Sequence, residues 1–427
     1  MGGLYRLKID RLTRSKSRGY IFSALLFFLF TACNERDETI PVNPEHDPTP
    51  EWNVIKTFTS DDFLTLMEKP KFSWIRLIIG HVHGKEQERL HAVKVTYYSP
   101  HPKGGIERIP MSGLLLLPPN IDSSCSHRLL LTLPYTYLFN RQTSTQQIIN
   151  YNPDQLEAFV LFGLLQASRG YIVLMPDYPG FGASFGRCTN PYVERRPMIR
   201  ATMDFIHASL RVLDAMHYRH GSTLTITGYS LGAYVATQTA REIEVDEKIS
   251  NRLRIDMLTV GGTPCDLVRI ADKVKTADHL PTPYLLPLAL HGYLHNGYPK
   301  LPINRILKSP YASLLDSCFD GCNENCPDTY PYHPSDLFTE SFIHGNEDSI
   351  INAVLRENSL TPWNNRCTFV MLHGSSDQTV YLDNASTYAK RHNASGGHVN
   401  FREIPGNHKE AGILFYIHLL LNLPQDQ

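Results

Sequence analysis

The sequence has no excess of charge of either sign. Its 427 residues include 41 lysine and arginine residues and 42 aspartate and glutamate residues, so the formal net charge is −1 at pH 7. A protein that binds nucleic acid normally presents a basic surface that neutralises phosphates. We therefore predict no nucleic-acid partner. Hydrophobic residues make up 42% of the chain and charged residues 19%, a balance typical of a globular protein rather than a disordered one.

The apolar segment near the start of the sequence is too short to span a membrane comfortably, which takes about 20 residues. This run, residues 20–30, follows a basic stretch and precedes a Phe-Thr-Ala-Cys sequence ending at Cys33. The pattern indicates an export signal, and its last residues resemble the lipobox of bacterial lipoproteins. We expect residues 1–32 to be a lipoprotein signal peptide, Cys33 to carry a lipid, and residues 33–53 to form a flexible tether. The expected location is the bacterial cell envelope, with plain secretion or a retained anchor as alternatives.

The cysteines form no clear metal-binding motif. Of its eight cysteines, seven remain when Cys33 is set aside, so at least one thiol is expected to be unpaired within the chain. Cys318, Cys322 and Cys326 recur at every fourth residue, but no histidine stands among them and turn-forming residues separate them. This favours a loop closed by a disulfide over a metal site. We expect neither a metal nor an organic cofactor.

Strand-like and helix-like segments alternate from about residue 54, which predicts an α/β fold with a mostly parallel central sheet and helices on both faces. The expected strands are 93–98, 111–117, 128–133, 171–175, 223–227, 257–260, 369–372 and 400–404. The expected helices are 154–168, 197–217, 231–243, 348–357, 382–392 and 409–421. No internal repeat is visible.

The alternation stops between residues 266 and 362, where the chain is rich in Pro, Tyr, Leu and His. This predicts a mainly helical cap over residues 267–362, inserted between two parts of one catalytic core, residues 54–266 and 363–427. The apolar and aromatic residues of 281–299 suit an acyl-binding wall. They suit the cap's own hydrophobic core equally well.

A nucleophilic serine is predicted at Ser230. A strand rich in β-branched residues leads into Gly228-Tyr-Ser-Leu-Gly232, and small residues that begin a helix follow. This strand-turn-helix context is that of a nucleophile elbow, in which the glycines allow close backbone approach and the helix N-terminus faces the developing oxyanion.

A serine hydroxyl needs a base to take its proton and an acid to orient that base. Asp377 follows an expected strand, and His408 lies in the loop after the next strand. The order Ser, Asp, His along the chain is that of α/β-hydrolases. We therefore predict Ser230, His408 and Asp377 as catalytic residues, and we interpret His373 and His418 as structural.

The oxyanion hole is expected to use the N–H of Leu231 and one N–H from the loop that follows Leu133. Pro134 has no N–H to donate. Tyr135 or Thr136 must then supply the second donor. We favour Thr136, whose hydroxyl is a candidate additional donor.

The segment Met175-Pro-Asp-Tyr-Pro-Gly-Phe-Gly-Ala-Ser184 resembles the Pro-Asp-Tyr-x-Gly-x-Gly-x-Ser loop of secreted α/β-hydrolase lipases of the fungal lipase A type and their bacterial relatives. Further matches are 228–232, 262–267 and the segments around Asp377 and His408. The resemblance covers roughly residues 90–420 and implies an α/β-hydrolase that cleaves esters beneath a helical cap. The chain departs from the family at Pro134-Tyr135, where His-Gly is usual, so the family assigns no oxyanion donor there.

Together these features predict a serine carboxylic-ester hydrolase, a lipase or esterase that acts on a small-molecule or lipid ester through an acyl-enzyme. Three alternatives remain open. They are an esterase that removes acetyl or feruloyl groups from polysaccharide, a serine peptidase of the same fold, and a binding lipoprotein without catalytic activity. The sequence indicates no oligomeric state.

Overall fold

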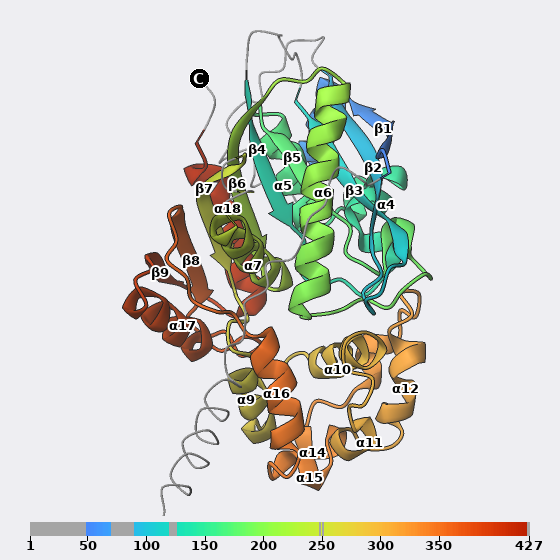
Figure 1. Cartoon of the computed structure of the whole chain (residues 1–427), viewed down its shortest axis with the longest axis vertical. Coiled ribbons are helices and arrows are strands. Elements are labelled where there is room, and N and C mark those ends of the chain that lie inside the picture. Colours follow the sequence, from blue (N-terminus) through green and yellow to red (C-terminus); the bar gives the residue numbers. More distant parts are fainter. Residues whose placement is uncertain (1–47, 70–88, 119–125, 247–248, 250–251, 425–427) are drawn as a thin grey trace, which may run out of the picture. The chain divides into compact units, whose positions relative to one another are not determined.

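The computed structural model describes residues 48–69, 89–118, 126–246, 249 and 252–424 (Figure 1). The predicted signal peptide, the predicted lipidation site Cys33 and the tether up to residue 47 lie outside the described residues. Among the helices that are described, none combines the length and the apolar character that a membrane crossing requires.

The described residues form one nine-stranded sheet in the order β1-β2-β3-β5-β4-β6-β7-β8-β9. The strands are β1 (Glu51–Phe58), β2 (Leu90–Pro100), β3 (Arg108–Leu117), β4 (His127–Leu133), β5 (Ile172–Pro176), β6 (His220–Tyr229), β7 (Arg254–Gly261), β8 (Thr368–Gly374) and β9 (Val399–Ile404). In this spatial order, the strands from β1 through β2 and β3 to β5 pair antiparallel with their neighbours. The strands from β5 through β4, β6, β7 and β8 to β9 pair parallel with theirs. The mostly parallel sheet expected from the sequence is therefore present.

Helices cover both faces of the sheet. In the described part of the chain, the α-helices outside the cap include α2 (Ser60–Glu68), α4 (Ser144–Ile149), α5 (Ala158–Ala167), α6 (Arg195–Ala215), α7 (Leu231–Val245), α17 (Leu382–Ala394) and α18 (His408–Asn422). In β3, a side chain at Gly113 would collide with Phe205 of α6, whereas the side chain of Leu116 lies beside Gly163 of α5. Because residues an odd number apart on a strand point to opposite faces, α5 and α6 lie on opposite sides of the sheet. α18 packs with α5, and α7 packs with α6.

All strands and helices expected from the sequence occur, with their ends shifted by a few residues. The helix expected over 154–168 begins only at Ala158, because Pro153–Gln155 form a separate 3-10 turn and Glu157 is extended. The central strands are easily recognised since both faces are covered and their residues are continuously apolar. All five residues of β5, for example, are buried.

The predicted end of the tether is wrong. Residues 51–53 belong to β1, which pairs antiparallel with β2 from Glu51 to Phe58. The first four residues of β1 are exposed, so the strand has no alternation of apolar side chains at its start. Main-chain hydrogen bonding to β2, rather than side-chain burial, brings these residues into the sheet.

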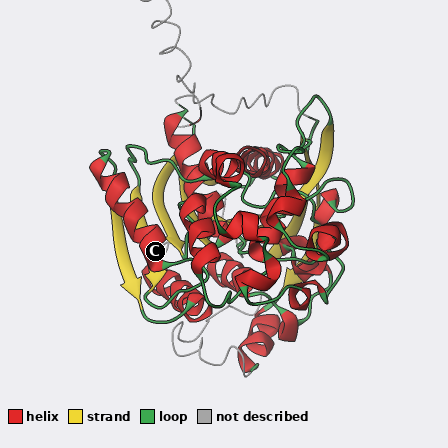
Figure 2. Ribbon diagram, turned by 90° about the horizontal axis from the view of Figure 1, so that it is seen from below, coloured by secondary structure: helices red, strands yellow, loops and turns green. Residues whose placement is uncertain are grey.

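The segment between β7 and β8 is helical. It contains α9 (Leu267–Thr276), α10 (Leu285–His295), α11 (Ile303–Ile306), α12 (Tyr311–Cys318), α13 (Cys326–Thr329), α14 (Pro334–Leu337), α15 (Glu340–Ile343) and α16 (Asp348–Asn358). α9 contacts α14, α15 and α16, and α10 contacts α12. Figure 2, a view from below Figure 1, shows these helices in front of the strands. We call this segment the cap.

The cysteines of the cap are free thiols, so the disulfide expected in this loop is absent from the structure. Cys318 and Cys326 are buried. The loop is held instead by Asp320, whose Oδ1 accepts from the main-chain N–H of Cys322 at 2.7 Å and of Asn323 at 2.9 Å. A local carboxylate therefore closes the turn that the cysteine spacing suggested a disulfide would close.

Candidate active site

Ser230 lies on a sharp turn between β6 and α7. Its φ of 55° and ψ of −121° are unusual for a residue with a side chain, and such strain is typical of a nucleophile elbow. A Cβ added at Gly228 would lie 2.2 Å from the carbonyl oxygen of Gly232, and one added at Gly232 would lie 2.1 Å from that of Leu133. Both glycines are therefore required by close backbone approach.

Ser230, His408 and Asp377 form a hydrogen-bonded chain. His408 Nε2 lies 3.0 Å from Ser230 Oγ, and His408 Nδ1 lies 2.6 Å from Asp377 Oδ2. The other carboxylate oxygen, Asp377 Oδ1, accepts from the main-chain N–H groups of Thr379 and Val380 at 2.9 Å each. The Asp377 side chain is fully buried, whereas that of His408 is 16% exposed. The carboxylate is thus oriented by the backbone, and the imidazole links it to the serine.

His408 is the first residue of α18, where a cap fixes the start of the helix. The Asn407 side chain accepts from the main-chain N–H groups of Lys409 and Glu410, and the Glu410 side chain accepts from the N–H of Asn407. This reciprocal arrangement is a capping box. It holds the backbone of His408 where the chain passes from the loop after β9 into the helix.

Two other histidines lie near the catalytic candidates. His373 lies beside Asp377, and His418 lies on the same helix as His408. His373 is buried at the end of β8, with Nε2 2.7 Å from the carbonyl oxygen of Val380 and 3.5 Å from Asp377 Oδ2. Burial lowers the pKa of His373, which favours a neutral ring that donates to Val380. His418 lies further along α18 and contacts Asn422. The structural roles of both residues stay predictions.

Tyr229 supports His408, a role that the sequence pattern did not reveal. Its hydroxyl donates to the carbonyl oxygen of His408 at 2.6 Å, and the two rings lie 5.1 Å apart. In the Gly-x-Ser-x-Gly pattern Tyr229 occupies a variable position. No local signal therefore distinguishes it from a residue that only packs.

The candidate oxyanion donors differ in their surroundings. Leu231 is the first residue of α7, where a helix N–H has no acceptor within its own helix. The Tyr135 hydroxyl donates to Glu157 Oε2 at 2.5 Å, so its side chain is directed towards the start of α5. The Thr136 hydroxyl instead lies 2.9 Å from the hydroxyl of Tyr192, and Tyr192 lines the same pocket as Ser230. Of the two loop candidates, Thr136 is therefore the one whose side chain contacts a residue of the pocket lining.

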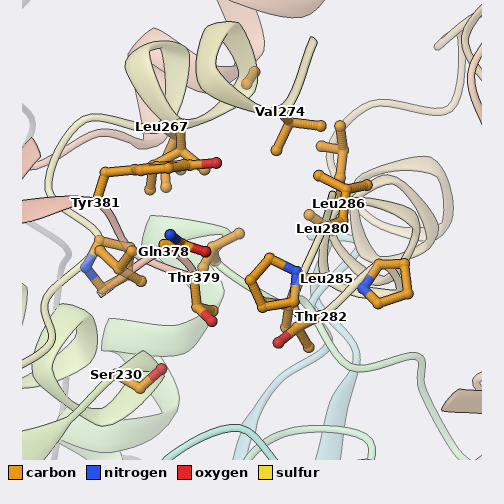
Figure 3. Close-up of a pocket in the computed structure, with 18 of the residues that line it drawn as sticks. Ser230, Leu267, Val274, Leu280, Thr282, Leu285, Leu286, Gln378, Thr379 and Tyr381 are labelled. Atoms are coloured by element: carbon orange, nitrogen blue, oxygen red, sulfur yellow. The ribbon is translucent and has the colours of Figure 1, made fainter. Parts of the chain in front are cut away.

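An apolar pocket connects Ser230 with the cap (Figure 3). The space between its lining residues is about 860 Å³ when the open solvent at its mouth is included. The cap contributes apolar side chains from α9 and α10, namely Leu267, Ile270, Ala271, Val274, Leu285, Leu286 and Ala289. Gln378, Thr379, Val380 and Tyr381, which follow Asp377, form another part of the lining. The pocket thus joins the nucleophile to an apolar surface supplied by the cap.

The expected acyl wall at residues 281–299 coincides with this lining only in part. Leu285 and Leu286 face the pocket, whereas buried residues of the same stretch do not line it, namely Leu288, Leu290 and Tyr293. The sequence reasoning missed the contribution of α9. Its lining residues follow the spacing i, i+3, i+4 and i+7, a helical stripe that could have been recognised.

A sequence profile of the secretory lipase family matches residues 145–414, and no curated protein sequence matches the chain. Among solved structures, the rice cell wall degrading esterase LipA from Xanthomonas oryzae has a TM-score of 0.71 and 22% identity, covering 89% of this chain and 97% of its own. Candida antarctica lipase A has a TM-score of 0.58 and 17% identity, covering 79% of each chain. The likeness establishes an α/β-hydrolase fold.

Proposed function

The chain belongs to the secretory lipase family, and we propose that it hydrolyses carboxylic esters through a triad of Ser230, His408 and Asp377. The observation that carries the proposal is the continuous chain of two hydrogen bonds, 3.0 Å from Ser230 Oγ to His408 Nε2 and 2.6 Å from His408 Nδ1 to Asp377 Oδ2. A general base must lie within such reach of the proton that it removes.

The triad geometry supports a two-step reaction. Ser230 Oγ attacks the ester carbonyl carbon while its proton moves to His408 Nε2, and His408 returns that proton to the departing alcohol oxygen. A water molecule then attacks the acyl-enzyme, gives its proton to His408, and Ser230 is released with its proton restored. Asp377 accepts a hydrogen bond from His408 Nδ1 throughout, which keeps Nε2 free to act as the base.

The negative charge on the carbonyl oxygen requires donors in the intermediate. We assign one to the main-chain N–H of Leu231 at the positive end of α7. We assign the second to Thr136 rather than Tyr135, because the hydrogen bond between Thr136 and Tyr192 holds this part of the loop beside the pocket.

The substrate that the pocket fits best is an ester with an apolar acyl group. Its lining is dominated by leucine, isoleucine, valine, alanine and proline side chains, which bind hydrocarbon by removing it from water. About 0.8 kcal/mol is gained for each methylene group buried, so a longer acyl chain gains more until the pocket is full. An acetyl group would leave most of this surface without a contact.

A polysaccharide esterase is the second candidate. The Xanthomonas oryzae enzyme with the same fold is named for degrading rice cell walls, and its likeness to this chain supports an esterase of the same kind. The apolar lining favours the lipase-like alternative, since an acetyl ester of a glycan would use a smaller and more polar site.

The location of the enzyme is a separate part of the proposal. We propose attachment to the bacterial envelope through a lipid on Cys33, supported by the export signal and the lipobox-like sequence before it. Metabolic labelling with a fatty-acid analogue tests this, with Cys33→Ala as the control. Label that persists in Cys33→Ala, or its absence from the parent chain, would contradict the lipid anchor.

The activity is tested by the hydrolysis of p-nitrophenyl esters from acetyl to palmitoyl, using the form that lacks residues 1–33. Ser230→Ala should abolish turnover and labelling by a fluorophosphonate, whereas Ser395→Ala, at an exposed position after α17, should change neither. A preference for medium or long chains supports the lipase-like function. Activity on acetyl esters alone would favour the polysaccharide esterase, and a lack of Ser230-dependent turnover and labelling would refute the proposal.

A further inference from the structure

Three potential metal ligands gather in the cap, apart from the catalytic residues. His291 and His295 lie on α10, and Asp316 lies on α12. Within the described part of the chain, no other group of three histidine, cysteine, aspartate or glutamate side chains meets so closely. Ester hydrolysis by the triad does not use any of the three.

Both imidazole rings direct a nitrogen to the same carboxylate oxygen. Asp316 Oδ1 lies 3.2 Å from His291 Nε2 and 2.6 Å from His295 Nε2. The three ligand atoms all lie within 4.8 Å of one another. Histidines four residues apart share one face of a helix, and the packing of α12 against α10 brings the carboxylate to that face.

The two distances to Asp316 are close to those of a tetrahedral zinc site. Zinc binds histidine nitrogen and carboxylate oxygen at about 2.0–2.2 Å, so neighbouring ligand atoms are roughly 3.3 Å apart. The separation of 3.2 Å between His291 and Asp316 already matches this value. The separation of 2.6 Å between His295 and Asp316 must increase, which a rotation of the Asp316 side chain, 75% exposed, can provide.

The three side chains differ in burial, so one ligand is held in place by packing while the other two face solvent. The His291 side chain is only 6% exposed, and its ring packs against that of Phe319 at 5.6 Å, so its orientation is fixed. The His295 side chain is 31% exposed and that of Asp316 is 75% exposed. An ion can therefore enter from solvent and keep a water molecule as its fourth ligand.

We propose that His291, His295 and Asp316 bind a divalent transition-metal ion, with Zn²⁺ as the best match, and that the ion links α10 to α12. The link bears on the pocket because α10 also carries Leu285, Leu286 and Ala289 of its lining. A bound ion would stabilise the helix that presents this apolar wall. Its role is structural, because the serine reaction needs no metal.

The test is Zn²⁺ binding by the full-length chain purified without a polyhistidine tag. Equilibrium dialysis should show one Zn²⁺ per chain at micromolar free metal, and Zn²⁺ at about a hundredfold excess over Kd should raise Tm by a few degrees. With Co²⁺ in place of Zn²⁺, visible ligand-field bands should report tetrahedral coordination by nitrogen and oxygen. These readouts do not depend on ester hydrolysis, so they remain informative if the proposed function fails.

Three variants test two of the proposed ligands, His295 and Asp316. His295→Ala and Asp316→Ala should each weaken Zn²⁺ binding at least tenfold, and Asp316→Asn should do the same because it keeps an accepting oxygen but loses the charge. The matched control is His344→Ala, which removes an exposed histidine that contacts Glu340 at 3.2 Å one helical turn away. Cooperative melting of every variant in EDTA shows that it is folded.

The proposal is overturned if the parent chain takes up no Zn²⁺ at micromolar concentrations. It is also overturned if Zn²⁺ binding persists unchanged in both His295→Ala and Asp316→Ala, which would assign the ion to other histidines among the 19 in the chain. Loss of binding in His344→Ala to the same extent would have the same meaning.

Discussion

The hydroxyl of Tyr229 donates a 2.6 Å hydrogen bond to the carbonyl oxygen of His408. Tyr229 directly precedes Ser230, so this bond joins the backbone that carries the nucleophile to the backbone that carries the base. The two residues are 179 positions apart in the chain. Their contact therefore joins the end of β6 to the start of α18 beside the catalytic candidates.

Tyr229→Phe tests this link. The ring and its packing against His408 remain, but the hydrogen bond is lost, and we expect kcat to fall about tenfold with little change in KM, because the base moves relative to Ser230. Stability should fall by about 1 kcal/mol. The matched control is Tyr97→Phe, which removes a buried 2.9 Å hydrogen bond to the carbonyl of Ala201. An equal loss of kcat in both variants would show a general effect of stability.

The triad predicts a distinct pattern of losses in kcat. Asp377→Asn should lower kcat by about 10⁴, since the amide no longer holds His408 in the required tautomer. His408→Ala should cost about 10⁶, and adding Ser230→Ala to it should cost little more, because the residues act as a unit. His418→Ala, on the same helix, is the control and should retain kcat. Independent, additive losses would contradict the proposed mechanism.

The apolar pocket predicts a change in chain-length preference for Leu286→Trp. Leu286 lines the pocket from α10, and a larger side chain there should occupy space needed by a long acyl group. We expect kcat/KM for palmitoyl ester to fall at least tenfold, while that for short esters changes less than threefold, since about two buried methylene groups correspond to a tenfold effect. Ile350→Trp, at an exposed position of α16, controls for added bulk. An equal loss for all chain lengths in Leu286→Trp would refute acyl binding here.

The buried carboxyl group of Glu194, at the start of α6, should make the free energy of unfolding depend on pH. Burial raises the pKa of Glu194 to about 8 from 4.5. The folded protein therefore keeps a proton that the unfolded chain releases between about pH 4.5 and pH 8. The contribution of this group to the free energy of unfolding is greatest below pH 4.5, decreases as pH rises, and levels off above about pH 8.

Glu194→Gln removes this titration. We expect the variant to match the parent in stability near pH 5 and to be more stable by up to a few kcal/mol at pH 8, since one pKa unit corresponds to about 1.4 kcal/mol. Urea unfolding at several pH values measures the difference. Glu340→Gln, at an exposed carboxylate, should show no such trend, and a difference between Glu194→Gln and the parent that is constant with pH would contradict the prediction.

Much of the core and the candidate triad could be predicted because their signals are local. Buried strands such as β5 are short apolar runs, and the elbow at Ser230 is recognised by Gly228 and Gly232, of which Gly228 is required by a contact with Gly232 only four residues away. Asp377 and His408 were recognised by their places after successive strands. A parallel sheet brings the carboxyl ends of its strands to one edge, so position along the chain carried information about position in space.

Other features depended on contacts that no local pattern encodes. β1 joins the sheet through hydrogen bonds to β2, although its first residues are exposed. The contact of Tyr229 with the carbonyl of His408 depends on how α18 packs beside β6. The meeting of Asp316 with two histidines depends on how α10 packs against α12.

By itself the sequence determined the succession of strands and helices, the elbow at Ser230 and the order of the three catalytic candidates, because backbone sterics and the periodic burial of apolar side chains operate over a few residues. Only the tertiary structure decided which side chains line the pocket and that a cluster of possible metal ligands forms in the cap. These features arise where segments distant in the chain pack together, and the distances between their side chains are set by that packing alone.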